Sequence, residues 1–258
     1  FLYESQGMTE PIRRGRDSTT NQHFFAQLAQ RIIKDMTQFG PYGRLFELDS
    51  RLRPTGRSGS LALSFDEFET LFAGDTQVWE RQSLCKARVV YGSQRVSDRV
   101  TQIVRSAILA KPWDGSMAKE IYGTRMKLEQ GATPTNLKRG RGGTVDIEFL
   151  VQMLQMKHAS EHPEVLCPGT LEAIANLREL ELLDTTDTEE MAGAYRFLRG
   201  VEARLRLMNT SKRHDLPATQ QQRQILAFLL GRSNGDNLEK EVRQVSNDNR
   251  RRFERFFT

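Results

Sequence analysis

Beyond residue 113, apolar residues recur at intervals of three and four positions, and no stretch alternates between apolar and polar residues for long. The first spacing places apolar side chains on one face of a helix, whereas alternation would place them on one face of a strand. We therefore predict an all-α second domain over residues 113–258, folded as a bundle of antiparallel helices. The predicted helices cover residues 116–130, 144–160, 168–182, 187–211, 217–231 and 236–257.

The first 112 residues combine helical and strand signals. A helix is predicted over residues 21–38, where the apolar stripe includes Phe24, Leu28 and Ile32. Two strands, over residues 45–53 and 60–64, and further helices, over residues 65–73, 75–90 and 93–110, follow it. The Lys-Pro-Trp-Asp-Gly segment at 111–115 interrupts the pattern and is the predicted domain boundary. The expected fold class is α+β and mostly helical, with a short sheet in the first domain.

The strand predicted over residues 45–53 carries charged side chains on one face. Glu47, Asp49, Arg51 and Arg53 alternate with other residues, so all four can project from the same side. Carboxylate oxygens suit a divalent metal, and guanidinium groups suit phosphate. The turn at 54–59 adds glycines whose N–H groups can approach an anion. The pattern favours part of a nucleotide site; a half-buried strand with a solvated salt-bridge face is the alternative.

A second group of charged residues surrounds the glycine-rich loop at 138–143, which precedes the helix predicted at 144–160. Such a loop can present N–H groups, the helix dipole and cationic side chains to an anion. Asp146 and Glu148 follow in the first turns, where acids are favoured in any helix. We expect one of these acids to bond Arg51 or Arg53, and so to couple the two domains, while the loop contacts a triphosphate.

Charge and composition narrow the classes of function. The net charge is +5, and the pI is about 9.4. No aromatic-interleaved basic stripe, zinc finger or RNA-binding motif accompanies this charge, so polyphosphate and an acidic protein partner are expected, rather than nucleic acid. No apolar run approaches the roughly 20 residues of a membrane helix. Cys85 and Cys167 are predicted to be reduced thiols, and the histidines show no zinc-site spacing.

Three blocks of the sequence stand out: ELDSRLRPTGRSGSLALS at 47–64, VWERQSLCKARVVYG at 78–92 and KRGRGGTVDIEFLVQ at 138–152. Together they resemble one enzyme family, the bifunctional glutamine synthetase adenylyltransferases of bacteria. The three blocks occur in the same order as in the family, and at similar spacings. Members of the family have two homologous catalytic halves. The residues at 79–82 and 87–92 are more similar to the adenylylating half than to the deadenylylating one.

The resemblance implies a polymerase-β-like nucleotidyltransferase domain followed by a helical bundle, and it also exposes a difference. In the family, a strand with a Gly-Ser-Asp-x-Asp motif supplies two metal-binding aspartates. Here Phe1–Tyr3 resembles the end of that strand, and the paired aspartates are missing. We therefore expect residues 1–112 to be a partial nucleotidyltransferase domain, and we expect the isolated chain to have little or no activity.

The resemblance also implies roles for individual residues. Asp49 is expected to be a third carboxylate that holds Mg²⁺, together with Glu47, or activates the attacking tyrosine hydroxyl. Arg51 and Arg53 are expected to stabilise charge on the phosphates of ATP. The residues expected to bind the nucleotide are Gly56, Arg57, Ser58, Gly59, Lys138, Arg139, Gly142 and Gly143.

The expected function is transfer of AMP from ATP to a tyrosine of glutamine synthetase in the bacterial cytoplasm. A PII-type signalling protein is a further expected partner, and no membrane is involved. Two alternatives stay open at this point. One is the deadenylylating, phosphorolytic half of the same enzyme, and the other is a non-catalytic regulatory or protein-binding fragment.

Overall fold

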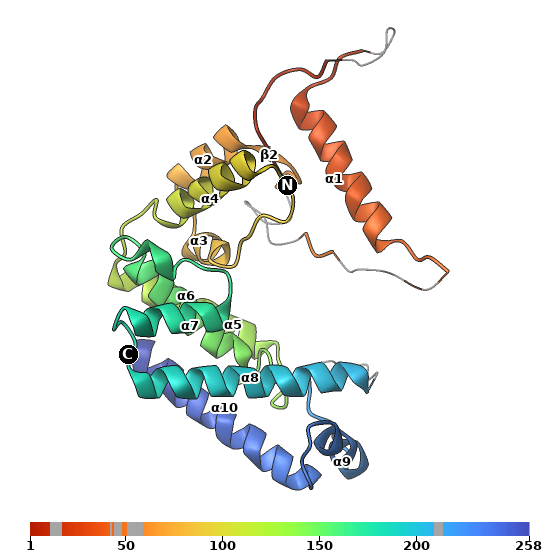
Figure 1. The fold of residues 1–258 in the computed structure, drawn as a ribbon, viewed down its shortest axis with the longest axis vertical. Coiled ribbons are helices and arrows are strands. Elements are labelled where there is room, and N and C mark those ends of the chain that lie inside the picture. Colours follow the sequence, from red (N-terminus) through yellow and green to blue (C-terminus); the bar gives the residue numbers. More distant parts are fainter. Residues whose placement is uncertain (11–16, 42, 44–47, 51–58, 209–213, 258) are drawn as a thin grey trace. The chain divides into compact units, whose positions relative to one another are not determined.

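The computed structural model describes residues 1–10, 17–41, 43, 48–50, 59–208 and 214–257. These residues form ten α-helices, one 3₁₀ helix and two short strands (Figure 1). The mostly helical α+β prediction is confirmed. The chain separates into two compact units, Phe1–Lys111 and Pro112–Thr258. Each unit has its own core and is described by itself.

The first unit contains the described strands. β1 (Leu2–Tyr3) pairs in parallel with β2 (Leu63–Ser64). α1 (Asn21–Thr37) lies between them in sequence, and α2 (Phe65–Ala73), α3 (Val78–Leu84) and α4 (Gln94–Ile108) follow. The polymerase-β-like identity of this unit stays a prediction.

The junction of β2 and α2 shows how local sequence determines this unit. Ser64 ends the strand and caps the helix, because its hydroxyl accepts from Glu67 N at 3.2 Å while the Glu67 carboxylate accepts from Ser64 N at 2.7 Å. This capping box directs α2 onto α4, and the two helices share a core. The buried core residues are Phe65, Phe68, Phe72, Ile103 and Ala107.

Three predictions for the first unit differ from the structure or lie outside it. The strand predicted over residues 60–64 is shorter, because β2 covers Leu63–Ser64 only. The helix predicted over residues 75–90 is wrong in length, because α3 ends at Leu84. Val90 and Tyr91 are 82% and 97% exposed, so a longer helix would gain no burial there. The strand predicted over residues 45–53 lies mostly outside the described residues, and residues 48–50 form no strand.

The second unit is all-α in its described part, as predicted. Its helices are α5 (Gly115–Gln130), α6 (Thr144–His158), α7 (Thr170–Glu179), α8 (Thr185–Leu207), α9 (Gln220–Leu229) and α10 (Gly235–Phe257). A 3₁₀ helix, η2 (Pro163–Val165), was not predicted. α6 packs against α5, α7, α8 and α10 (Figure 1). Eleven of its 15 residues are buried, so it is the central helix of this unit.

A second apolar cluster joins α8, α9 and α10. Its buried residues are Leu137, Leu198, Val201, Leu205, Leu226, Ala227, Leu238 and Val242. Leu137 belongs to the segment before the glycine-rich loop, so this cluster also anchors the start of that loop. Within the described part of the chain, no helix has the length and apolar character that a bilayer crossing requires.

Candidate functional site

The first group of predicted site residues lies largely outside the described part of the chain. Asp49 is described and exposed, and Gly59 is described and half-buried. The residues outside the described ranges are Glu47, Arg51, Arg53, Gly56, Arg57 and Ser58. The catalytic, metal-binding and nucleotide-binding roles of this group therefore stay predictions.

The second group, the loop at 138–143, is described completely and connects α5 to α6. Asn136 organises its start, because the Asn136 Oδ1 atom accepts from Lys138 N at 3.1 Å and from Arg139 N at 2.8 Å. The carbonyl of Asn136 accepts from Gly140 N at 3.0 Å. An asparagine that bonds main-chain groups two and three residues on is a common turn device. The loop thus has a defined backbone conformation.

Gly142 and Gly140 allow the loop to pack closely. Gly142 has a φ of +70°, and a Cβ atom there would overlap the main-chain oxygen of Ser246 on α10. At Gly140 a Cβ atom would overlap the oxygen of Asn136. Only glycine combines the left-handed conformation with this close approach of two backbones. The glycines therefore place the loop directly against α10.

The main-chain N–H groups of this loop have partners inside the second unit. Gly142 N donates to Asp146 Oδ2 at 2.9 Å, and Gly143 N donates to the Gly140 oxygen at 3.0 Å. Both glycines are buried. The expectation of free N–H groups is thus wrong for these two residues, because the turn and Asp146 occupy them. If the loop binds the nucleotide, its cationic side chains Lys138 and Arg139 make the contacts. Nucleotide binding by the loop stays a prediction.

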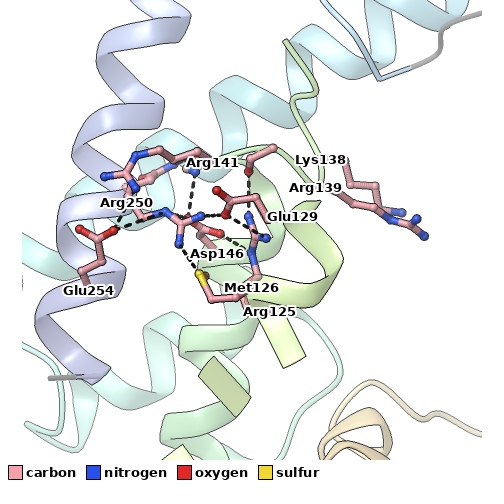
Figure 2. Close-up of polar contacts among 12 residues, drawn as sticks. Arg125, Met126, Glu129, Lys138, Arg139, Arg141, Asp146, Arg250 and Glu254 are labelled. Atoms are coloured by element: carbon pink, nitrogen blue, oxygen red, sulfur yellow. Dashed lines mark hydrogen bonds and ion pairs between the residues drawn. The ribbon is translucent and has the colours of Figure 1, made fainter. Parts of the chain in front are cut away.

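Asp146 lies at the centre of a buried cluster of charges (Figure 2). Its side chain and that of Arg125 are each 0% exposed, and the two form an ion pair through Arg125 Nε. Arg250 of α10 is 1% exposed, and its Nε atom lies 3.1 Å from Asp146 Oδ2. Both arginines also pair with Glu129 of α5. The cluster joins α5, α6 and α10 at the point where the loop enters α6.

Burial changes the acid–base behaviour of this cluster. It raises the pKa of Asp146 to about 6, although the charge of Arg125 and the Gly142 N–H group act in the opposite direction. Burial also lowers the pKa of Arg125. The pKa of Arg250 is lowered to about 10 by burial and by the neighbouring charge of Arg125. Each shift has the sign expected when an ionised group leaves water.

The basic side chains of the loop lie outside this cluster. Arg139 is exposed and Lys138 half-buried, and both extend away from the buried charges (Figure 2). Arg141 turns toward α10, where its Nη1 atom donates to Glu254 Oε1 at 3.0 Å. The arrangement can present two cations to an anion from a fixed backbone.

Glu148 takes part in a separate contact. Its Oε1 atom accepts from the hydroxyl of Tyr195 on α8 at 2.8 Å, and burial raises the pKa of Tyr195 to about 12. The predicted bond from Asp146 or Glu148 to Arg51 or Arg53 involves arginines outside the described residues and stays a prediction. The partners described for both acids belong to the second unit.

Sequence reasoning did not identify Arg125, Arg250 or Asn136 as site residues. Arg125 and Arg250 lie within ordinary helical patterns, where a charged residue suggests a solvated face. Asn136 did carry a signal, because asparagine before a glycine-rich segment favours a turn. The two arginines had none, since their pairing depends on helices that are distant in sequence.

A groove of about 850 Å³ lies along α8 and α10. Its charged lining residues include Asp187, Arg252, Glu241 and Arg232. Arg252 Nε donates to Asp187 Oδ1 at 2.9 Å, and Arg232 pairs with Glu241 at 2.6 Å. Its lining includes none of the predicted site residues, so the groove adds nothing to the predicted nucleotide site.

Comparison with known proteins gives matches over both units. Residues 1–103 match the family model of glutamate-ammonia ligase adenylyltransferase, and residues 118–257, more than half of the chain, match that of GlnD PII-uridylyltransferase. Three relatives, each described as a bifunctional glutamine synthetase adenylyltransferase/adenylyl-removing enzyme, are similar over most of the chain. The relative from Rhodopseudomonas palustris (strain HaA2) is 35% identical over 206 residues, which is 79% of this chain and 21% of the relative. Those from Bradyrhizobium diazoefficiens and Neisseria meningitidis (serogroup A) are 30% and 32% identical over 94% and 90% of this chain, and over 25% of each relative.

The chain belongs to the glutamine synthetase adenylyltransferase family. Its second half belongs to the family described as GlnD PII-uridylyltransferase. The resemblance based on residues 47–64, 78–92 and 138–152 is thereby confirmed. The chain spans 21% to 25% of the length of these adenylyltransferase relatives.

Proposed function

We propose that this chain takes part in transferring AMP from ATP to a tyrosine hydroxyl of glutamine synthetase. The observation that supports this most is the similarity, over most of the chain, to curated relatives bearing that activity in their names, together with the match of residues 1–103 to the adenylyltransferase family model. The loop at 138–143 is compatible with the proposal, because it holds Arg139 exposed on a defined backbone.

The proposed reaction is nucleotidyl transfer. The tyrosine oxygen attacks the α-phosphorus of ATP, a new P–O bond forms, and the bond to the β-phosphate oxygen breaks as pyrophosphate leaves. The tyrosine proton passes to a base, for which Asp49 is the candidate. Arg51 and Arg53 would stabilise the negative charge on the phosphate oxygens, while Lys138 and Arg139 would bind the triphosphate.

Mg²⁺ is implied by the family, and the described residues do not fit it. Among them, no group of three or more histidine, cysteine, aspartate or glutamate residues could hold a metal ion. Glu47, the proposed partner of Asp49 in metal binding, lies outside the described ranges. Each step of the proposed reaction is therefore assigned to side chains of the chain itself.

The reverse type of reaction is a second candidate, because the relatives are named as adenylyl-removing enzymes as well as adenylyltransferases. In that reaction an oxygen of inorganic phosphate would attack the phosphorus of the tyrosine-bound AMP, ADP would form, and the tyrosine oxygen would leave and take up a proton. The same cationic groups would then bind phosphate and nucleotide. The match to a PII-uridylyltransferase model adds a PII-type protein as a candidate partner, and the bacterial cytoplasm is the proposed location.

The test is AMP transfer from α-labelled ATP to purified glutamine synthetase by the full-length natural protein, with Asp49→Ala as the variant. We expect a loss of about a hundredfold or more, as for removal of a group that acts on the reacting atoms. Asp98→Ala is the matched control, since Asp98 is an exposed aspartate of the same unit, on α4. Phosphate-dependent release of ADP from adenylylated glutamine synthetase is measured in parallel.

The results distinguish between adenylylation, removal of AMP and a non-catalytic role. Loss of transfer only assigns the chain to adenylylation, and loss of ADP release only assigns it to removal of AMP. Retention of both activities in a folded Asp49→Ala protein would contradict catalysis by this chain, and would favour a non-catalytic module that binds a regulatory protein.

A further inference from the structure

We propose that Arg125, Asp146 and Arg250 are positioning residues that hold the loop at 138–143 in the conformation that presents Lys138 and Arg139 to the triphosphate. This role rests on the proposed function of the loop, and it adds Arg125 and Arg250, which the sequence did not single out, to Asp146. Arg125 and Asp146 pair with each other and bond to the loop backbone, and Arg250 acts through its ion pair with Asp146. In this proposal none of the three contacts the nucleotide.

The first step of the argument is that the cluster bonds directly to the loop backbone. Arg125 Nη2 donates to the oxygen of Gly140 at 2.8 Å. Asp146 Oδ2 accepts from Gly142 N at 2.9 Å. A third side chain, Asn249 of α10, donates to the oxygen of Gly142 at 3.1 Å. The loop is therefore bonded to side chains of α5, α6 and α10.

The second step is the direction of the side chains. Arg125, Asp146 and Arg250 lie on the buried side of the loop, whereas Lys138 and Arg139 extend away from them (Figure 2). The backbone between them is short and has the left-handed turn at Gly142. A change in the anchoring at Gly140 or Gly142 would therefore shift the two cations. Misplacing a binding group by about 1 Å can reduce an enzymatic rate by as much as about a hundredfold.

The third step concerns the free energy that is needed to bury the charged groups of the cluster. Taking charged groups out of water costs several kcal/mol per ion, and a buried ion pair is often no more stabilising than apolar residues of the same size. Simple packing of α5 against α6 and α10 would therefore be served equally well by apolar side chains. Arg125, however, uses a planar fork to reach Asp146 and Gly140 at once, and neither lysine nor an apolar residue can do this.

The test uses the full-length natural protein with Arg125→Lys and Asp146→Asn. Both changes nearly keep the size of the side chain. Arg125→Lys removes the fork that reaches Asp146 and Gly140 together, and Asp146→Asn leaves one acceptor oxygen where two serve Arg125 Nε and Gly142 N. The matched control is Arg243→Lys, because Arg243 lies on α10 in an ion pair with Glu239 and its side chain is 71% exposed. Arg125→Lys and Arg243→Lys both keep the positive charge and a trypsin site.

Two quantities are measured for each protein. One is the rate of tryptic cleavage after Lys138, Arg139 and Arg141 under native conditions, followed by mass spectrometry. The other is the KM for ATP, measured with kcat in the AMP-transfer reaction. Arg125→Lys and Asp146→Asn are called the clamp variants. We expect each of them to raise the rate of loop cleavage and the KM for ATP by on the order of tenfold. Both quantities should keep their wild-type values in Arg243→Lys. Cleavage at the other sites of the second unit should stay as in the wild type.

Three results would overturn the inference. The first is loop cleavage at the wild-type rate in both variants. The second is cleavage that rises throughout the second unit, which would indicate general packing. The third is an unchanged KM for ATP in the clamp variants when Lys138→Ala raises it. The double variant Lys138→Ala/Arg139→Ala tests the proposed function separately: if it leaves the KM for ATP unchanged, the loop does not bind the nucleotide, whatever the cleavage rates show.

Discussion

Helices α1 and α6 are similar in length, with 17 and 15 residues, but they differ in burial. Ala29 is the one buried residue of α1, all of which the structure describes, whereas eleven residues of α6 are buried. Phe24 and Leu28 of the apolar stripe of α1 are 45% and 40% exposed. An apolar stripe thus predicts a helix in both cases, but it does not determine how much of the helix becomes buried.

The two helices also begin differently. α1 has a local cap, because the hydroxyl of Thr20 accepts from His23 N at 3.2 Å. At the start of α6 there is no side-chain cap on Gly143, and Thr144 N instead donates to the oxygen of Leu137 at 2.9 Å. Asn21 N, at the start of α1, also donates to the oxygen of Gly7 at 2.8 Å, so both helices begin against a preceding segment. The difference is that α1 adds a side-chain cap, whereas α6 has none.

The largest expected difference in stability is between alanine substitutions of two glycines, Gly142 before α6 and Gly7 before α1. Gly142→Ala should reduce the free energy of unfolding of the second unit by about 4 kcal/mol or more, because strain at positive φ adds to the overlap with Ser246. Gly7→Ala should cost only about 1 to 2 kcal/mol, since Gly7 has a φ of +134° and no atom closer than 3.8 Å to an added Cβ. Denaturant unfolding, with hydrogen exchange of each unit, measures both. Equal losses would contradict the close packing of the loop on α10.

The next effect compares leucines within the two helices. Leu150 of α6 is 2% exposed, and Leu150→Ala should cost about 3 kcal/mol through lost burial and a cavity. Leu28 of α1 is 40% exposed, and Leu28→Ala should cost less than about 1 kcal/mol. The same measurement applies. A loss at Leu28 as large as that at Leu150 would mean that the apolar face of α1 is buried in solution.

The smallest effect is a dependence on pH. Burial raises the pKa of Asp146 from 3.8 to about 6, so the folded protein binds this proton more tightly than the unfolded chain. Its contribution to the free energy of unfolding is therefore highest below about pH 4 and falls as the pH rises through 6. Relative to Asp146→Asn, the wild type should lose about 2 kcal/mol between about pH 4.5 and about pH 6.5.

Hydrogen exchange of the α6 amides at the two pH values, corrected for intrinsic rates, measures this change. Asp35→Asn on α1 is the control, because Asp35 is exposed and pairs with Arg31 at a distance of 3.8 Å. Such surface pairs contribute little to stability. A wild-type protein that gains stability relative to Asp146→Asn over this range would show that the ion pair with Arg125 outweighs burial.

The helices of the second unit were predictable because their signals are local. Leu171, Ile174 and Leu177 recur at intervals of three within α7, where Ile174 and Leu177 are 1% and 0% exposed and Leu171 is half-buried. The end of α3 was not predictable, because the helical pattern of the sequence continues beyond Leu84. Residues 86–95 are exposed or half-buried, so a longer helix would not be stabilised by burial there.

In the candidate site, too, some residues were predictable from local sequence and others were not. The loop at 138–143 was identified from its glycines and cations. Its anchors, Arg125 and Arg250, lie 21 residues before and 104 residues after Asp146 in the sequence, by their numbering. A charged residue at a helical position is usually solvated, and only the packing of α5 and α10 against α6 removes these two from water.

The amino-acid sequence by itself determined the family, the mostly helical fold class and the position of the glycine-rich loop, because each depends on short-range patterns or on residues at known spacing. The tertiary structure alone decided which helix became central and which charges became buried. It also decided that the loop N–H groups of Gly142 and Gly143 bond within the protein. These features depend on contacts between segments far apart in the chain, whose energies change with burial and therefore do not follow from local sequence.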